Sequence, residues 1–370
     1  MPDSGQPPGR VPGDQADAIN PVVSSNSSHI PNAVIYGCSG PVLSGDEKRF
    51  FADARPAGFI LFERNCQNPD QVRALVQELL DCIGQAQAPI LIDQEGGRVQ
   101  RLKPPHWRDA PPPAVFKALA GLDQGLAVEA ARLNAQLIAA ELLDVGITVN
   151  CAPVLDVPGP GSHEIIGDRA FGDDPATVSA LGLATAEGFL SMGVLPVIKH
   201  IPGHGRAKAD SHHDLPLVDA SMADLESVDF PSFRALRHMP WAMTAHVVYA
   251  ALDKAAPATT SALVISDAIR GTIGFDGVLV SDDLSMKALA GSMQARAEAA
   301  LAAGCDLVLH CCGDMVEMQD VAQGVASLSN AAAVRLARGE DMLGRLADWD
   351  GAAALARLND ILKPLTPEVL

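Results

Sequence analysis

The sequence is poor in aromatic and in basic residues. Only 4% of its 370 residues are Phe, Trp or Tyr, and 27 Lys and Arg stand against 45 Asp and Glu, which gives a formal net charge of -18. Nucleic acids and anionic membrane surfaces select basic patches, so this charge balance argues against both as partners. The sequence also lacks any run close to 18 apolar residues, the minimum for a candidate membrane-spanning helix.

Paired cysteines and an export signal are missing as well. The seven cysteines form no CxxC pair, and their odd number in apolar surroundings predicts reduced core residues of a cytoplasmic protein. Residues 1–30 contain no charged segment followed by an apolar one, and their content of Pro, Gly, Ser, Asn and Asp predicts a disordered extension. Residues 31–370 are long enough for a large core.

Short apolar segments alternate with helical patterns along those residues. Apolar spacing of about 3.6 residues predicts helices at 70–84, 127–146 and 292–304. The expected strands are 33–37, 58–62, 89–93, 146–153, 195–201, 241–248, 277–283 and 306–312. Eight such units predict an α/β fold with a single (β/α)8 TIM-type barrel. A doubly wound open sheet is the alternative, but it usually has a Gly-rich turn after its first strand.

Polar residues gather where the expected strands end, which is where this barrel fold builds its active sites. They are Asp93, Lys199, His200, Asp282 and Asp283, with His246 on the sixth strand. Solvated surface charges would be spread over both rims, so this grouping predicts a pocket with convergent polar groups.

Six motifs resemble one enzyme family. They are DQEGGRVQR (93–101), APVLDV (152–157), IIGDRAFGDDP (165–175), KHIPGHG (199–205) followed by ADSH (209–212), TAHVVY (244–249) and FDGVLVSDDLSM (275–286). Together they resemble the β-N-acetylglucosaminidases of glycoside hydrolase family 3, the NagZ-type β-hexosaminidases of peptidoglycan recycling. The resemblance runs from about residue 33 to about residue 345 and implies one catalytic barrel over residues 31–370.

The resemblance implies a retaining exo-glycosidase with a covalent intermediate. Such an enzyme needs a carboxylate nucleophile and a proton donor at the leaving oxygen. Asp282 aligns with the family's nucleophile, and Asp283 is expected to brace the loop or the barrel rim. His212 takes the acid/base role, and Asp210, two residues earlier on the same face of an extended stretch, would hold its imidazole and support its charged form.

The resemblance also implies the ligands and the substrate. By motif match, the non-reducing GlcNAc is bound by Asp93, Arg101, Arg169, Lys199 and His200. The substrate is expected to be GlcNAc-1,6-anhydro-N-acetylmuramic acid, with or without peptide, cleaved by a cytoplasmic monomer without metal or other cofactor. His204 is expected to brace its loop and His213 to be only a neighbour of the dyad, while His246 either lines the sugar site or packs in the core.

Two alternatives remain open from the residues. A metal-dependent barrel hydrolase would use His200, His204, His246 and Asp282, which are ligand types on neighbouring strands. Such sites commonly add an HxH at the end of the first strand, where this chain has CSG. A catalytically inactive sugar-binding barrel would require loss of the nucleophile or of the loop dyad, and both are present.

Overall fold

The computed structural model describes residues 1–2, 30–159, 161, 163–207, 215–344 and 348–365. The chain divides into two units, Met1–Ile30 and Pro31–Leu370, and the second contains every helix and strand described below. Asp210, His212 and His213 lie outside the described residues.

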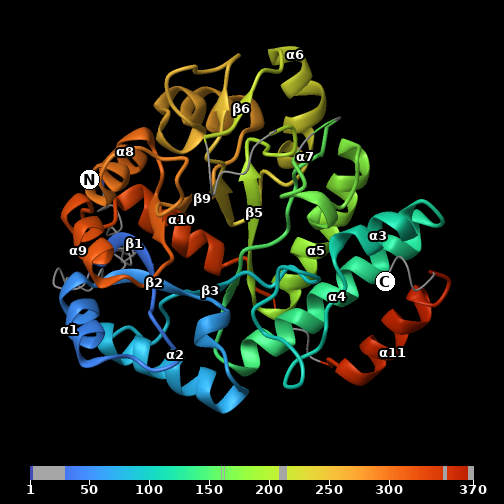
Figure 1. Cartoon of the computed structure of the whole chain (residues 1–370), viewed down its shortest axis with the longest axis horizontal. Helices are drawn as coiled ribbons and strands as arrows, with labels where there is room; N and C mark the ends of the chain where they lie inside the picture. The colour runs from blue at the N-terminus through green and yellow to red at the C-terminus, as the bar shows by residue number, and fades with distance from the viewer. Residues whose placement is uncertain (3–29, 160, 162, 208–214, 345–347, 366–370) are drawn as a thin grey trace. The chain divides into compact units, whose positions relative to one another are not determined.

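Eight parallel strands close into a barrel in the order β1-β10-β9-β7-β5-β4-β3-β2 (Figure 1). They are β1 (Asn32–Gly37), β2 (Pro56–Leu61), β3 (Ile90–Ile92), β4 (Val149–Asn150), β5 (Leu195–Ile201), β7 (Trp241–Thr244), β9 (Val278–Asp283) and β10 (Leu307–His310). A separate two-stranded parallel sheet joins β6 (Leu217–Val218) to β8 (Val248–Tyr249). The predicted barrel is confirmed, and the open sheet is excluded.

Helices surround the barrel (Figure 1). The α-helices are α1 (Gly45–Ala54), α2 (Pro69–Ile83), α3 (Pro113–Ala120), α4 (Gln124–Asp144), α5 (Pro175–Met192), α6 (Met222–Asp224), α7 (Phe230–Ala235), α8 (Met293–Ala303), α9 (Met315–Gly324), α10 (Asn330–Glu340) and α11 (Gly351–Leu362). Short 3-10 helices are η1 (Glu63–Asn65), η2 (Gly167–Arg169) and η4 (Ala258–Thr260), and π-helical turns are η3 (Leu225–Asp229) and η5 (Val264–Ile273). The three helices expected from apolar spacing correspond to α2, α4 and α8.

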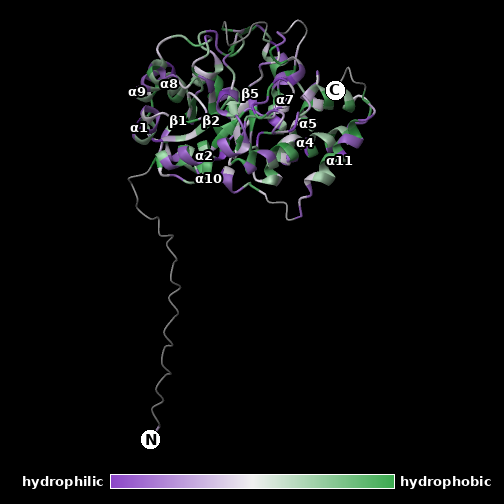
Figure 2. Cartoon of the chain, turned by 60° about the horizontal axis from the view of Figure 1, so that its bottom comes forward, coloured by the Kyte–Doolittle hydropathy of each residue, from purple (hydrophilic) through white to green (hydrophobic). Residues whose placement is uncertain are grey.

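Alternate residues of each strand face opposite sides of the barrel wall, as the two-residue period of a strand requires. Ile35, Val197 and Val280 pack in a buried cluster inside the barrel. Val34 and Ile198, each next to one of these, belong instead to the larger cluster between strands and helices. Figure 2, coloured by hydropathy, shows the strands around β5 enclosed by helices that are hydrophilic on part of their surface.

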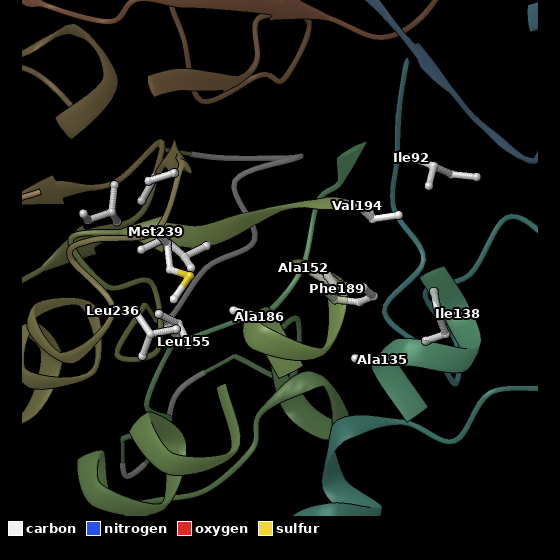
Figure 3. Close-up of a cluster of buried hydrophobic side chains, with 14 of the residues drawn as sticks. Ile92, Ala135, Ile138, Ala152, Leu155, Ala186, Phe189, Val194, Leu236 and Met239 are labelled. Carbon is white, nitrogen blue, oxygen red and sulfur yellow. The ribbon is translucent and has the colours of Figure 1, made fainter. Parts of the chain in front are cut away.

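The contact between α4 and α5 illustrates the outer layer. Phe189 of α5 lies beside Ala135 and Ile138 of α4 beneath the barrel strands, while Ala186 of α5 lies on the side of Leu155 (Figure 3). The helices approach closely because α5 has glycine at position 188, where a Cβ would lie 2.8 Å from the Cβ of Ala135. Phe189 is 1% exposed and fills the space between the helices and the strands.

Five expected strands are shorter than predicted, and those expected at 146–153 and 241–248 lose the most residues. The strand expected at 146–153 pairs only at Val149 and Asn150, where the Asn150 side chain bonds the backbone of Gln94 at 3.0 and 2.9 Å. The strand expected at 241–248 leaves the barrel after Thr244, and Val248 bonds the carbonyl of Pro216 instead. Both departures depend on long-range partners.

All seven cysteines are free. The prediction that they are core residues holds for four of them, but Cys66 and Cys82 are half-buried and Cys312 is exposed. In the part of the chain that the structure describes, no helix is both long enough and apolar enough to cross a membrane.

Candidate active site

A cavity of about 220 Å³ opens at the carboxyl ends of the barrel strands. Its polar lining is Asp93, Arg98, Arg101, Arg169, Lys199, His200, His204, Asp282 and Asp283. Its apolar lining is Ile60, Phe62, Val99, Ile165, Ile166, Met243, Met286, Leu309 and Cys311. The structure therefore brings together all five residues expected to bind sugar and the expected nucleophile, from segments up to 189 positions apart in sequence.

Strand periodicity explains why charged side chains reach this cavity. Lys199 lies two residues beyond Val197, and Asp282 lies two residues beyond Val280, so both continue the inward-facing series of β5 and β9. Asp93 follows Leu91 of β3 in the same way. The alternation that fills the barrel with apolar side chains thus ends, at the carboxyl rim, in ionisable ones.

An alternating chain of charges runs along one side of the cavity, and all of its members except the buried Glu95 line it. Lys199 Nζ lies 2.8 Å from Asp93 Oδ1 and 2.6 Å from Glu95 Oε1. Arg169 binds Glu95 through Nε and Nη2, both at 2.8 Å, and Arg101 Nη2 lies 3.1 Å from Asp93 Oδ2. Three cations against two carboxylates leave one net positive charge. The Lys199 side chain is only 2% exposed and that of Glu95 only 1%.

Burial and pairing act in opposite directions on these groups. Burial alone would raise the pKa of Asp93 and of Glu95. Lys199 and Arg101 instead hold the pKa of Asp93 below its usual range, and Arg169 and Lys199 hold the pKa of Glu95 at about 2. Burial would lower the pKa of Lys199, but the two carboxylates raise it. Asp93, Glu95, Lys199 and Arg169 are therefore charged at neutral pH, and a ligand meets fixed donors and acceptors.

Asp156 organises the other side of the cavity. It is fully buried and its Oδ2 accepts from His200 Nδ1 at 2.7 Å, while its Oδ1 accepts from the backbone N–H of His204 at 2.6 Å. Because a carboxylate can only accept, Nδ1 of His200 carries the proton and Nε2 is the ring nitrogen available to a ligand. The contact from Asp156 supports the expectation that His204 braces its loop, although its ring also lines the cavity.

His204 and His246 are both neutral at physiological pH. Burial, reinforced by His200, lowers the pKa of His204 to about 4. Burial also lowers the pKa of His246, which is fully buried. His246 Nε2 donates to the carbonyl of Asp283 at 2.9 Å, so its Nδ1 accepts from the Thr259 hydroxyl at 2.7 Å. Of the two expectations for His246, packing is therefore correct, and the residue supports the strand end that bears Asp282.

The paired aspartates differ in their surroundings. Asp282 is 7% exposed and faces the cavity, and its Oδ1 accepts from the backbone N–H of Asp283 at 2.8 Å. Asp283 Oδ1 accepts from the backbone N–H groups of Ser285 and Cys311 at 3.0 and 3.1 Å. Asp283 thus ties the turn after β9 to the end of β10, as expected for a residue that braces the rim.

The four histidine and aspartate ligands of the metal-hydrolase alternative do not converge. Asp156 occupies Nδ1 of His200, and both ring nitrogens of His246 are engaged. Among the described residues, the ligand atoms of this set do not gather within coordinating distance. This arrangement does not fit a metal bound by His200, His204, His246 and Asp282.

Three functional residues were missed from the sequence: Glu95, Asp156 and Arg98. Each lies inside a motif quoted above, and Glu95 lies two residues after Asp93 in the segment that follows β3. Arg98 lines the cavity and holds the segment before η2 through the carbonyls of residues 164–166, with its Nε 2.6 Å from Asp168. In the sequence, all three could have been noticed as charged residues that lie inside a motif but had been given no role.

The segment after β5, which bears Asp210 and His212, is anchored before it leaves the described residues. A Cβ at Gly205 would clash with the backbone of Val157, so only glycine allows this approach. Arg206 Nε lies 2.7 Å from Asp229 Oδ2, and the Tyr249 hydroxyl donates to the carbonyl of Gly203 at 2.8 Å. The two catalytic residues expected on this segment lie outside the described residues, so their roles stay predictions.

Comparisons with known proteins agree with this geometry. The family model described as glycosyl hydrolase family 3 N terminal domain matches residues 41–338. A curated β-hexosaminidase from Alkalilimnicola ehrlichii is 40% identical over 282 residues, which cover 75% of this chain and 80% of that protein.

Solved structures give the same picture. Native NagZ from Neisseria gonorrhoeae has a TM-score of 0.79 at 32% identity, covering 90% of this chain and 99% of that one. NagZ from that organism has also been solved in complex with N-trifluoroacetyl-D-glucosamine. A family 3 β-N-acetylglucosaminidase from Paenibacillus sp. has a TM-score of 0.72 at 32% identity, and this chain spans 61% of its length.

Proposed function

Because this chain belongs to glycoside hydrolase family 3 and is a β-hexosaminidase of the NagZ type, we propose that it releases non-reducing terminal GlcNAc from GlcNAc-1,6-anhydro-N-acetylmuramic acid. The substrate carries or lacks a peptide, and the reaction serves peptidoglycan recycling in the cytoplasm. Seven free thiols support a reducing compartment. We expect a monomer that acts on a small soluble muropeptide without a cofactor.

The observation that carries this proposal is the buried charge chain beside Asp282 in one cavity. At about 220 Å³ the cavity is smaller than the ~300–1,000 Å³ of typical small-molecule sites, which favours a single sugar unit. Charged donors and acceptors make the stronger hydrogen bonds to hydroxyl groups. Asp93, Arg101, Arg169, Lys199 and His200 would bind the hydroxyl and acetamido groups, and Glu95 beneath them would hold Lys199 and Arg169 in place.

The proposed chemistry is double displacement. The Asp282 carboxylate attacks the anomeric carbon while the bond to the leaving oxygen breaks and His212 protonates that oxygen. His212 then removes a proton from water, the water attacks the same carbon, and the bond to Asp282 breaks, which regenerates the enzyme with retained configuration. Asp282 lies near the end of a buried strand, where the barrel fixes the position of its side chain. This position supports Asp282 as the nucleophile.

The substrate class is tested by comparing hydrolysis of an aryl β-GlcNAc, an aryl β-glucoside and GlcNAc-1,6-anhydro-N-acetylmuramic acid, each with and without chelator. We expect the two GlcNAc substrates to be cleaved and the glucoside to be poor, with no effect of chelator on chemistry. Preference for the glucoside, or loss of turnover on chelation, contradicts the proposal.

The nucleophile is tested with a fluorinated glycosyl substrate that forms the intermediate quickly and releases it slowly. Peptide mapping by mass spectrometry should place the adduct on Asp282. An adduct on Asp283, or product of inverted configuration, would refute the assignment.

The acid/base role is tested with His212→Ala, with His213→Ala as the matched control. A poor leaving alkoxide needs protonation and a nitrophenolate does not, so His212→Ala should lose ~10²- to 10⁴-fold on the disaccharide and far less on the aryl substrate. Added azide should restore turnover and give a β-glycosyl azide. Equal losses on both substrates without azide product would assign the role to another residue.

A further inference from the structure

A second cluster of chemically active side chains lies beside the barrel mouth, outside the cavity. His310 ends β10, Cys312 follows two residues later, and Glu317 lies in the first turn of α9. His310 Nε2 and Glu317 Oε2 are 3.1 Å apart, Cys312 Sγ and Glu317 Oε2 are 3.1 Å apart, and Cys312 Sγ and His310 Nε2 are 3.5 Å apart. Among the described residues, no other group of three His, Cys, Asp or Glu brings its ligand atoms so close together.

These separations match the edges of a metal coordination tetrahedron. Zinc bonds of about 2.3 Å to sulfur, about 2.0–2.1 Å to nitrogen and about 2.0–2.2 Å to oxygen give tetrahedral edges of about 3.5–3.7 Å from S to N or O and about 3.3–3.5 Å from N to O. The three observed distances lie within a few tenths of an ångström of these values. A thiolate, a carboxylate and a neutral imidazole together carry two negative charges, which a divalent cation neutralises.

The backbone around the cluster holds two of the ligands in place. Asp314 caps α9 by accepting from the N–H groups of Val316 and Glu317 at 2.9 and 3.0 Å, which fixes the turn that carries Glu317. The backbone N–H of Asp314 also points at Cys312 Sγ, 3.3 Å away, as it would to stabilise a thiolate. Gly313, with φ of 74°, makes the turn between these residues and leaves no room for a side chain against the backbone of Cys38.

The imidazole is held mainly by packing. His310 is fully buried and its ring meets Tyr36 edge to face, with ring centroids 6.2 Å apart. Cys312 is exposed and the Glu317 side chain is 40% exposed. An ion can therefore reach Cys312 and Glu317 from solvent, while the buried His310 would bind it from the protein side, and one position of a tetrahedral site remains for water.

We propose that His310, Cys312 and Glu317 bind a zinc ion that links the end of β10 to α9. Mg²⁺ and Ca²⁺ prefer all-oxygen sites, whereas a set of one thiolate, one imidazole and one carboxylate suits Zn²⁺. The site is separate from the glycosidase chemistry and does not depend on the proposed function. Its closest link to the active site is Cys311, whose backbone N–H donates to Asp283 at 3.1 Å, so the ion would stiffen the turn that supports the rim.

The test uses the purified full-length chain, kept reduced, stripped with chelator and dialysed. Zinc binding is measured by elemental analysis and by competition with a chromogenic chelator, and Co²⁺ serves as a spectroscopic probe. We expect one equivalent of zinc that depends on these residues, a thiolate-to-cobalt charge-transfer band, and a rise in the midpoint of thermal unfolding on zinc addition, since a ligand of the folded state stabilises it.

Variants at the two solvent-accessible ligands keep the test independent of the buried His310. Glu317→Gln should weaken zinc binding by more than about 10-fold, and Cys312→Ser by about 100-fold or more. Loss of a residue that only hydrogen-bonds a metal ligand already costs ~10- to 100-fold in affinity, so loss of a ligand should cost at least as much. Cys82→Ser is the matched control at a half-buried cysteine. Asp282→Asn reports any zinc held in the catalytic cavity. Both variants should still bind the one equivalent of zinc assigned to His310, Cys312 and Glu317. Unchanged zinc binding in both ligand variants, or a cobalt spectrum without the thiolate band, would overturn the proposal.

Discussion

Removing the charge of Glu95 tests whether the buried charge chain is held together as the structure implies. Glu95→Gln keeps the shape of the side chain but removes the carboxylate that Arg169 contacts twice and Lys199 once. Lys199 keeps Asp93 as a partner, whereas Arg169 loses its only carboxylate in these contacts. Arginine cannot release its proton, so the variant leaves a buried cation without compensation.

Two independent routes give the expected loss of stability. Removing one partner of a buried ion pair costs about 3–5 kcal/mol. The pKa of Glu95 is about 2 against an ordinary value of 4.5, which corresponds to about 3 kcal/mol of stability at pH 7, since a tenfold change in proton affinity is about 1.4 kcal/mol. Both figures are of the same order, so we expect Glu95→Gln to lower the free energy of unfolding by about 3–5 kcal/mol at pH 7.

The depressed pKa of Glu95 also predicts how its contribution to the free energy of unfolding changes with pH. The pKa of Glu95 is depressed in the folded state, so its contribution is present above pH 4.5 and is lost as the pH falls from 4.5 toward 2. The difference in unfolding free energy between wild type and Glu95→Gln should therefore be constant between pH 7 and 6 and should shrink by about 1 kcal/mol by pH 3.5.

Urea unfolding followed by circular dichroism and Trp fluorescence measures these differences. Glu187→Gln is the matched control, because the Arg132–Glu187 pair is 44% and 42% exposed and such pairs contribute only about 0–1 kcal/mol. A loss below about 1 kcal/mol for Glu95→Gln, or a loss equal to that of Glu187→Gln, would refute the reasoning.

Three further predictions concern the loop, the His200 site and the core. Gly205→Ala should push the segment after β5 away from Val157. It should lower kcat by about 100-fold, since a shift of about 1 Å at a catalytic group costs that much. Gly40→Ala should leave kcat unchanged, because a Cβ at position 40 meets open space. Asp156→Asn should raise KM and lower kcat/KM by about 10-fold or more through the orientation of His200, with about 2–5 kcal/mol lost in urea unfolding; unaltered kinetics would contradict that role. Phe189→Ala should cost about 3–5 kcal/mol in the same assay, against less than about 0.5 kcal/mol for Leu122→Ala at an exposed site.

The barrel could be predicted from sequence because its signals are local. Each strand is a short apolar run and each helix carries a 3.6-residue pattern, so eight repeats limited the topology to very few choices. The same alternation placed Lys199 and Asp282 on the inward face at the carboxyl rim. Boundaries were less predictable where a distant partner decides them, as at Asn150, whose side chain bonds Gln94 from another strand end.

The partners of the charged residues could not be predicted, because they depend on distances across the barrel. Sequence placed Asp93 and Lys199 in one site, but the Glu95 carboxylate that joins Lys199 to Arg169 became evident only when segments 74 and 104 positions apart were brought together. The same is true of Asp156 beneath His200.

The sequence by itself determined the residue types at the rim, the barrel that presents them and the family to which they belong, because these follow from local periodicity and contiguous motifs. Only the tertiary structure decided that His246 supports the carbonyl of Asp283 instead of a ligand, that Asp283 braces β10, and that Cys312 is exposed beside His310 and Glu317. Hydrogen bonds and ligand geometry require atoms to lie within about 3 Å, and positions far apart in the chain reach that distance only in the folded barrel.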